Sequence, residues 1–340
     1  MRALMIDAAG RVRLGDAPSP SLGQEDVLLR VRMIGFCGSD LNTFRGLNPL
    51  VAYPRIPGHE IAATVETIGE HVPDGLFAVG DDVTVLPYTA CGRCAACRRG
   101  RSNACRDNET LGVQRDGAMT ELLSVPWNKV VSAQGLSRRE LALVEPLSVG
   151  FHAVDRGRVL PSDTVVVIGC GAVGLGAIAG ARERGANVIA VDVDEGKLEI
   201  ARRAGASITL STAPALLSER VAALTNGDGA DVVIEAVGIP ETFVASVQAA
   251  AFTGRVVYIG YAKAPVSYDT SQFVKKELDI LGSRNATRED FQRVTTLLQR
   301  RTFPVDAAVS RCVSLDDAGR ALEDWDRDTR SITRIHVELS

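Results

Sequence analysis

The chain has 340 residues, of which 46% are apolar and 24% are charged, so it is long enough for two domains with separate cores. Its net charge of −4 argues against a nucleic-acid-binding protein, because such proteins usually carry a basic domain. No stretch approaches the roughly 18 apolar residues of a transmembrane helix, and the first residues lack a signal-peptide pattern, so we expect a cytoplasmic protein without membrane or nucleic-acid partners.

The first third of the chain predicts a β-rich domain. Short β-branched runs bounded by Gly, Pro or Asp predict strands at residues 27–32, 62–68 and 82–86. Turn-forming clusters at 18–20 and 79–82 separate these runs. This pattern is typical of a compact barrel-like or sandwich domain.

Three short motifs in this part of the chain carry side chains that bind metals. Cys37 lies in the motif GFCGSD, His59 and Glu60 lie in PGHE, and Glu145 lies in VEP. Cysteine, histidine and carboxylate are the ligands of catalytic zinc sites, which keep one position open for water or substrate. Each residue also has an ordinary explanation: Cys37 as a core thiol, His59 as a loop residue and Glu145 as a surface acid. Spacing alone leaves both interpretations open.

Four cysteines follow the pattern C-x2-C-x2-C-x7-C, at Cys91, Cys94, Cys97 and Cys105. Thiolates this close in sequence can converge on one tetrahedral Zn²⁺. Because four protein ligands leave no open position, such an ion would stabilise structure and take no part in chemistry. The pattern therefore predicts a structural zinc site.

From about residue 160 the pattern changes to alternating strands and helices. Apolar strands are predicted at 164–168, 187–191, 231–235, 255–259 and 278–281. Helices are predicted up to residue 184 and over 195–204, and such alternation indicates a doubly wound parallel sheet with both faces covered. The tail from 286 to 340 is predicted as two helices and a final strand at 334–339, which could return to the first domain.

The first of these strands runs into a glycine-rich loop that predicts dinucleotide binding. In this loop Gly169 permits the tight turn, Gly171 lets the backbone approach a pyrophosphate, and Gly174 allows close packing of helix and strand. Ala172 and Val173 belong to the start of the following helix, whose free N–H groups can bind the anion.

Asp192 lies eighteen residues after Gly174, at the end of the second strand of this region. A carboxylate there would bind the adenosine ribose hydroxyls and repel a 2′-phosphate, which favours NAD over NADP. The alternatives are a domain that binds a flavin or another nucleotide, and an Asp192 that only caps the next helix. Cys170, between the first two glycines, is expected to be a packing residue.

These motifs have the order and approximate spacing of the zinc-dependent medium-chain dehydrogenases, and the chain resembles that family over essentially its whole length. It is most similar to the polyol, threonine and sugar-acid branch, because the alcohol dehydrogenases proper carry a second catalytic cysteine where this chain has Glu145. The resemblance implies a GroES-like β-rich catalytic domain from residues 1–150 and 286–340, with a structural-zinc lobe at 88–108. It also implies an NAD-binding Rossmann domain at 151–285 and a homodimer or homotetramer.

The resemblance further implies one catalytic and one structural zinc ion, with NAD as the second cofactor. Cys37, His59 and Glu60 would be the catalytic-zinc ligands together with a water, and Glu145 would either exchange with Glu60 or hold that water. Ser39 would pass the substrate proton outward. Ser39 could also cap a helix that starts near Asp40, whose own expected role is to support a metal ligand.

The implied substrate is a sugar acid or polyol. Arg284 lies where polyol dehydrogenases of this family keep an arginine in the substrate pocket, and a guanidinium suits hydroxyl or carboxylate groups. Asn285 replaces their usual aromatic residue, and segments 282–286 and 45–49 are more similar to the L-gulonate and L-galactonate 5-dehydrogenases. We therefore expect oxidation of the C5 hydroxyl of an aldonate. Sorbitol or L-threonine oxidation is the alternative, and a zinc-free quinone reductase or a non-catalytic NAD-binding protein is a more distant one.

Overall fold

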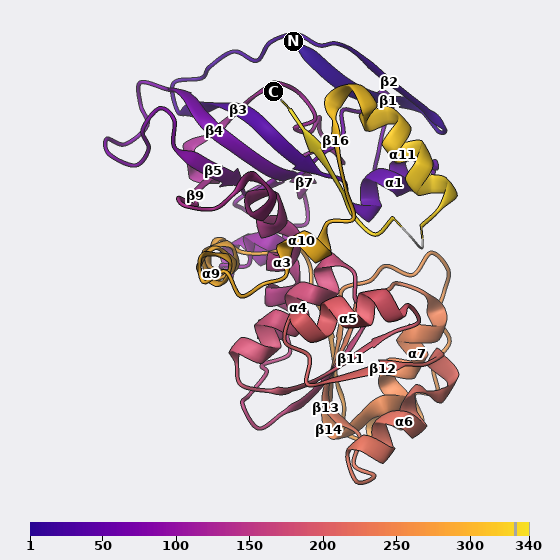
Figure 1. The fold of residues 1–340 in the computed structure, drawn as a ribbon. Coiled ribbons are helices and arrows are strands. Elements are labelled where there is room, and N and C mark those ends of the chain that lie inside the picture. Colours follow the sequence, from indigo (N-terminus) through magenta and orange to yellow (C-terminus); the bar gives the residue numbers. More distant parts are fainter. Residues whose placement is uncertain (330–331, 340) are drawn as a thin grey trace. The chain divides into compact units, whose positions relative to one another are not determined.

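The computed structural model describes residues 1–329 and 332–339, and the chain divides into two compact units (Figure 1). The first unit contains Met1–Glu145, Thr287–Arg301 and Val305–Ser340, and the second contains Pro146–Ala286 and Thr302–Pro304. The boundary after Glu145 falls inside helix α3 (Arg138–Arg156), so this helix belongs to both units.

A seven-stranded sheet forms the core of the first unit. Its strands are β3 (Asp26–Gly35), β4 (Glu60–Ile68), β5 (Asp82–Val85), β8 (Leu122–Pro126), β9 (Val130–Ser132), β16 (Arg311–Ser314) and β17 (Ile335–Glu338). The order is β16-β17-β3-β4-β5-β9, and β8 also pairs with β3. Along β3, buried side chains alternate with partly exposed ones, as expected for a strand with one face against a core. The predicted strands at 27–32 and 62–68 are confirmed as parts of β3 and β4, and the predicted strand at 82–86 extends one residue beyond β5.

Smaller elements complete the N-terminal part of the first unit. They are the hairpin β1 (Arg2–Ala8) and β2 (Arg11–Asp16), helix α1 (Gly38–Phe44), and, in the cysteine-rich lobe, β6 (Tyr88–Thr89), α2 (Ala95–Arg98), a 3-10 helix at Ser102–Ala104 and β7 (Glu109–Thr110). In this lobe the structure describes one strand pair, β6 with β7, and each of these strands has two residues. Such a lobe has little regular structure to hold it together without a bound ion.

The C-terminal strand returns to the first unit, as expected. β17 pairs antiparallel with β3, with His336 opposite Gly35. The prediction of two helices and one strand for the tail was incomplete, because the tail contains α9 (Arg288–Gln299), α10 (Val305–Ala308), β16 and α11 (Ala318–Arg327) before β17. β16 has only four residues and no strongly buried alternation, so it gives almost no strand signal in the sequence.

The second unit is a doubly wound parallel sheet, which confirms the predicted fold class. Its strands are β10 (Thr164–Ile168), β11 (Asn187–Asp192), β12 (Ile208–Ser211), β13 (Ala230–Glu235), β14 (Ala250–Tyr258) and β15 (Asp279–Gly282). Its helices after α3 are α4 (Ala172–Glu183), α5 (Glu195–Arg203), α6 (Leu217–Leu224), α7 (Pro240–Ala249) and α8 (Ser271–Lys275). The strand order is β12-β11-β10-β13-β14-β15, so the chain adds strands on one side of β10 up to β12 and on the other side from β13 onward. Ligands of such sheets bind at the carboxyl ends of the strands at this switch point.

The strands of this sheet are apolar because helices cover them. Val166 and Ile189 are completely buried, and residues of α6 and α7 pack against them in one core cluster. No helix within residues 1–329 and 332–339 combines the length and apolar character needed to span a membrane.

Candidate functional site

Three potential metal ligands converge where β3 ends and β4 begins. Cys37 follows β3 by two residues, and Glu60 is the first residue of β4, directly after His59. Antiparallel pairing places Gly35 opposite Glu60, which brings these distant segments together. One ligand atom of each of Cys37, His59 and Glu60 lies within 4.8 Å of the other two. The structure therefore groups the three residues that the motifs singled out.

Asp40 holds the backbone on both sides of this ligand group. Its carboxylate accepts hydrogen bonds from the N–H of Cys37 (2.8 Å) and the N–H of Gly58 (3.4 Å). Cys37 is the N-cap of α1 and Asp40 completes a capping box, so the alternative that Ser39 caps this helix is wrong. The buried Oγ of Ser39 has no hydrogen-bond partner within the described part of the chain.

The electrostatic environment of His59 attracts a cation. Burial lowers the pKa of His59, but the thiol of Cys37 and the carboxylates of Asp40 and Glu145 raise it, and the net effect is a pKa well above the usual value. The buried Nδ1 of His59 has no hydrogen-bond partner among the described residues. An unsatisfied imidazole nitrogen, a thiol and a carboxylate in one negative site fit the donor set of zinc.

Glu60 is also held by an arginine that the sequence motifs did not identify. The guanidinium of Arg334 bonds to both oxygens of Glu60, with Nη2 at 3.0 Å from Oε1 and Nη1 in close contact with Oε2. Arg334 precedes β17, so the return of the C-terminal segment to β3 brings it to the site. No local pattern could have predicted a pair separated by 274 positions in sequence.

Glu145 lies on α3 and is buried, so the alternative of a surface acid is wrong. Burial raises the pKa of Glu145 to about 7, and the charge of Glu60 adds to this effect, whereas His59 and Arg334 oppose it. The hydroxyl of Tyr88, a second residue that the sequence analysis missed, donates a hydrogen bond to Oε1 of Glu145. Glu145 is thus electrostatically coupled to the ligand group.

The four cysteines of the lobe form a separate cluster. The sulfur of Cys94 lies 3.5 Å from that of Cys97 and 3.8 Å from that of Cys105, and Cys105 lies 3.5 Å from Cys91. These distances are close to the edge of about 3.8 Å of a tetrahedron of thiolates around Zn²⁺, and much longer than a disulfide bond.

Two of these thiols have pKa values that are shifted in opposite directions. Backbone N–H groups of Arg106 and Cys97 lower the pKa of Cys94 to about 6, whereas burial and neighbouring thiols raise the pKa of Cys97 to about 12. Thiols this close cannot all ionise unless a cation joins them, because like charges disfavour each other. The cluster therefore fits a structural zinc ion.

The dinucleotide loop has the geometry that its glycines predict. Gly169 has a φ of +94°, and a Cβ at this position would lie 2.7 Å from Cγ2 of Val237. A Cβ on Gly174 would lie 1.8 Å from the carbonyl oxygen of Gly169, whereas a Cβ on Gly171 would meet nothing within 4 Å. The loop is thus closely packed behind Gly169 and Gly174 and open at Gly171. Ala172 and Val173 begin α4 directly after this open position.

Asp192 is held against this loop. Its Oδ2 accepts a hydrogen bond from the N–H of Cys170 (2.8 Å), and its Oδ1 accepts from the N–H groups of Val193 (2.8 Å) and Asp194 (3.1 Å). The N-cap of α5 is Asp194, so the alternative that Asp192 only caps this helix is wrong. Cys170 is buried, and burial raises its pKa above the usual range, as expected for a packing residue.

Arg284, expected in the substrate pocket, and Arg45, in the segment 45–49, have different settings. Arg284 follows β15 by two residues, at the carboxyl edge of the sheet in the second unit. Arg45 follows α1 and is bonded to Asp326 of α11, through Nε to Oδ1 (2.5 Å) and Nη2 to the backbone oxygen (3.1 Å). Arg45 therefore anchors its loop to α11.

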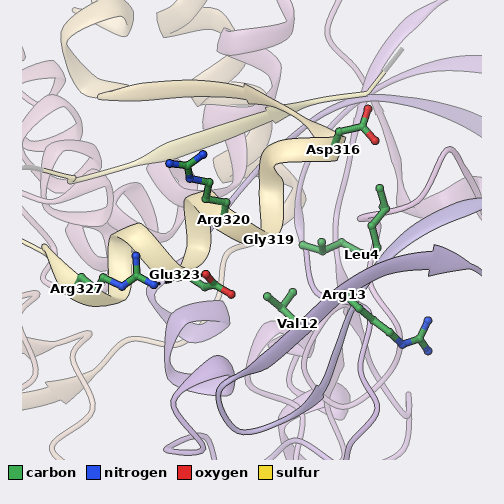
Figure 2. Close-up of a pocket in the computed structure, with 9 residues that line it drawn as sticks. Leu4, Val12, Arg13, Asp316, Gly319, Arg320, Glu323 and Arg327 are labelled. Carbon is green, nitrogen blue, oxygen red and sulfur yellow. Dashed lines mark ion pairs between the residues drawn. The ribbon is translucent and has the colours of Figure 1, made fainter.

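A hollow of about 410 Å³ lies between α11 and the β1–β2 hairpin of the first unit. Figure 2 shows Arg320, Glu323 and Arg327 along α11, with Leu4 and Val12 of the hairpin opposite them. None of the residues that line it is one of the potential metal ligands, so this hollow is separate from the candidate site.

Comparisons with known proteins agree with this geometry. Residues 23–135 match the family described as "Alcohol dehydrogenase GroES-like domain", and residues 172–300 match the family described as "Zinc-binding dehydrogenase". L-galactonate-5-dehydrogenase of Escherichia coli K12 is 34% identical over 288 residues, covering 84% of each chain. Sorbitol dehydrogenase of Bacillus subtilis is 33% identical over 289 residues, covering 83% of this chain and 81% of the relative.

The fold also matches solved structures. The crystal structure of a short chain alcohol dehydrogenase from Escherichia coli CFT073, complexed with the cofactor NADH, has a TM-score of 0.91 and 25% identity, and the match covers 100% of this chain and 99% of the other.

Proposed function

The chain belongs to the zinc-dependent medium-chain dehydrogenases, and we propose that it uses NAD to oxidise the C5 hydroxyl of an aldonate such as L-gulonate or L-galactonate to a ketone. The observation that carries this proposal is the convergence of Cys37, His59 and Glu60, with the buried Glu145 electrostatically coupled to them. Two buried carboxylates beside one cysteine distinguish this site from that of the alcohol dehydrogenases proper.

Cys37 and His59 would hold the catalytic zinc, with Glu60 or Glu145 as the carboxylate that binds it or orients its water. Zinc bound there acts as a Lewis acid that lowers the pKa of the substrate hydroxyl, and NAD supplies the hydride acceptor. The Oγ of Ser39, two residues after Cys37, has no hydrogen-bond partner among the described residues, and we propose that it takes a hydrogen bond from that hydroxyl and passes its proton onward.

The chain's own groups prepare this site before substrate binds. Asp40 fixes the backbone of Cys37 and Gly58, so the spacing of the two protein ligands does not depend on the metal alone. Arg334 balances the charge of Glu60. We propose that Cys91, Cys94, Cys97 and Cys105 bind the second, structural zinc ion.

For the cofactor, we propose that Gly169, Gly171 and Gly174, together with the N-terminus of α4 at Ala172 and Val173, bind the pyrophosphate. Asp192 would bind the adenosine ribose. Its carboxylate is fixed by the N–H of Cys170, which supports a preference for NAD because a 2′-phosphate would meet this negative charge.

For assembly, we propose a homodimer or homotetramer. β15 is the outer strand of the six-stranded sheet, and its residues are mostly exposed, including Ile280. Such an edge offers unpaired backbone groups to another copy of the chain. Light scattering on the purified protein would distinguish a monomer from these oligomers.

The experiment that tests the substrate is a panel of L-gulonate, L-galactonate, sorbitol, L-threonine and simple alcohols, each with NAD and with NADP, and with zinc measured on the same sample. We expect two zinc ions per chain and the highest kcat/KM for an aldonate with NAD. Efficient turnover of neutral polyols without aldonate activity would refute the aldonate proposal and favour a polyol dehydrogenase.

Arg284 gives a sharper test of carboxylate recognition. We expect Arg284→Ala to raise KM for aldonates at least tenfold more than KM for sorbitol, since a guanidinium–carboxylate pair contributes about 1.5–3 kcal/mol. Arg284→Lys keeps the charge but loses the planar fork and should lie between the two. An equal rise in KM for aldonates and for sorbitol would show that Arg284 does not bind the substrate carboxylate.

A further inference from the structure

Tyr88 brings a hydroxyl group to the candidate site from the base of the cysteine-rich lobe. Its side chain is 5% exposed, and its OH donates a hydrogen bond to Oε1 of Glu145, which is also 5% exposed. The backbone of Tyr88 is fixed separately, since β6 pairs with β7 opposite Thr110 and the Nζ of Lys129 donates to the Tyr88 carbonyl at 2.6 Å. The phenol is therefore held from its backbone side and presents its OH to Glu145.

The two carboxylates of the site are held in different ways. Both oxygens of Glu60 are engaged by the guanidinium of Arg334, a charged partner that competes with any cation for them. Oε1 of Glu145 is engaged by the hydroxyl of Tyr88, which carries no charge that would compete with a cation and leaves the remaining lone pairs of the carboxyl group. Glu145 is thus the carboxylate with more capacity to bind a metal or a metal-bound water.

We propose that Tyr88 is a positioning residue, whose hydroxyl orients Glu145 toward the catalytic zinc or its water. This inference rests on the proposed zinc site at Cys37 and His59. It also gives the cysteine-rich lobe a role in the active site, because Tyr88 stands only three residues before Cys91. The lobe would hold the strand that carries the hydroxyl.

The first test is Tyr88→Phe, which removes only the hydroxyl. Loss of a group that orients a metal ligand typically costs about 10–100-fold in metal affinity or activity. We expect the zinc ion at Cys37 and His59 to be lost at a chelator concentration about 10–100-fold lower than in the unchanged protein. We also expect a shifted visible spectrum of the cobalt(II)-substituted enzyme and a lower kcat. NADH binding and the unfolding midpoint should change little.

Tyr53→Phe is the matched control. The Tyr53 hydroxyl also donates a hydrogen bond, to the carbonyl of Thr43 at 2.5 Å, and Thr43 is not one of the potential metal ligands. The control should leave chelator resistance and the cobalt spectrum unchanged. A purely structural role for Tyr88 would instead lower the unfolding midpoint without changing the cobalt spectrum, and that result would overturn the proposal.

A double-mutant cycle with Glu145→Ala tests whether Tyr88 acts through Glu145. We expect Tyr88→Phe to have little further effect once Glu145 is removed, whereas additive effects on metal affinity would overturn the proposal. A parent enzyme that binds a single zinc ion would refute the proposed function and this inference with it. If the parent and Tyr88→Phe enzymes each bind two zinc ions and have the same chelator resistance and the same cobalt spectrum, this inference alone is refuted.

Discussion

Arg334 and Glu60 form an ion pair between residues 274 positions apart, and both side chains are almost completely buried. Taking two charges out of water is unfavourable, so such a pair is maintained by its geometry and by the cost of leaving either charge alone. Arg334 meets both oxygens of Glu60 in the planar arrangement that a guanidinium allows. The pair therefore both holds Glu60 and joins the C-terminal segment to the start of β4.

We predict that Arg334→Met destabilises the protein by about 3–5 kcal/mol, because Glu60 would remain as a buried, unpaired charge. The measurement is the free energy of unfolding in urea. Arg138→Met is the control, since Arg138 pairs with Glu338 on the surface at 3.2 Å and such pairs contribute less than about 1 kcal/mol. A cost for Arg334→Met as small as that of the control would contradict a tight buried pair.

A second residue-scale prediction concerns His336 on β17. It is fully buried, neither ring nitrogen has a hydrogen-bond partner in the described residues, and burial lowers its pKa to about 3. Because the folded pKa lies below the usual value of about 6.5, the unfolded chain binds more protons between pH 6.5 and 3. Stability is thus complete above pH 6.5 and is lost as the pH falls toward 3.

We expect this loss to reach about 2 kcal/mol at pH 5, and His336→Leu to abolish that part of the pH dependence. Urea unfolding at pH 7.5 and pH 5 measures the difference. At pH 7.5 the Leu variant should be as stable as the parent, since the imidazole makes no hydrogen bond to the described residues that Leu would remove. The control is His71→Gln, because His71 is exposed. If the unfolding free energy of His336→Leu depends on pH as in the parent, His336 is not the source of this dependence.

At the scale of elements, one carboxylate holds the turn after β13, which lies beside the dinucleotide loop. Oε1 of Glu235 accepts hydrogen bonds from the N–H groups of Val237 (2.8 Å) and Gly238 (2.7 Å) and from the hydroxyl of Thr242 (2.8 Å). Val237 packs against Gly169, so Glu235 determines the shape of the wall beside the predicted pyrophosphate site. The turn lies at the switch point of the sheet.

We predict that Glu235→Ala raises the Kd for NADH at least fivefold, because the turn loses three hydrogen bonds to a charged acceptor. Glu235→Gln, which keeps the accepting oxygen, should recover most of the affinity. Thr242→Val removes a single donor and should have a smaller effect than Ala. NADH fluorescence titration measures all three, and equal affinity in Glu235→Ala and the parent would show that the turn does not shape the site.

The elements that could be predicted are those whose pattern is local. β10 and β11 are continuous apolar strands, and the predicted bounds agree to within one residue. β14 begins at Ala250, five residues before the predicted start, because its first part contains two alanines and a glycine, which are depleted in strands. β16 was missed because four residues of mixed character carry no periodicity.

The same distinction applies to the site. Cys37, His59 and the four lobe cysteines lie in short motifs with recognisable spacing, and the structure groups their ligand atoms. Arg334 and Tyr88 could not be found in this way. Arg334 reaches the site through the pairing of β17 with β3, and Tyr88 reaches it through a hydrogen bond to Glu145, 57 positions later in the sequence. Neither residue type is by itself a sign of a metal site.

At the scale of the whole molecule, the metal ligands and the dinucleotide loop belong to different units of the chain. Cys37, His59 and Glu60 lie in the first unit, whereas the glycine loop and Asp192 lie in the second. The two binding activities are therefore built by separate cores, and α3 and the C-terminal segments connect the units along the chain. A substitution in one site should leave binding at the other intact.

This separation predicts a reciprocal result for Cys37→Ser and Asp192→Ala. Cys37→Ser should abolish turnover and reduce zinc from two ions to one per chain, because a hydroxyl is a poor substitute for a thiolate ligand, while the Kd for NADH stays within about twofold. Asp192→Ala should keep both zinc ions but weaken NADH about tenfold, since it removes the carboxylate proposed to bind the ribose and a support of the loop. Zinc analysis and NADH titration on the same samples make the comparison. Loss of NADH binding in Cys37→Ser would contradict the conclusion that the two sites are built by separate cores. Full activity in Cys37→Ser would exclude Cys37 as a ligand of a catalytic zinc.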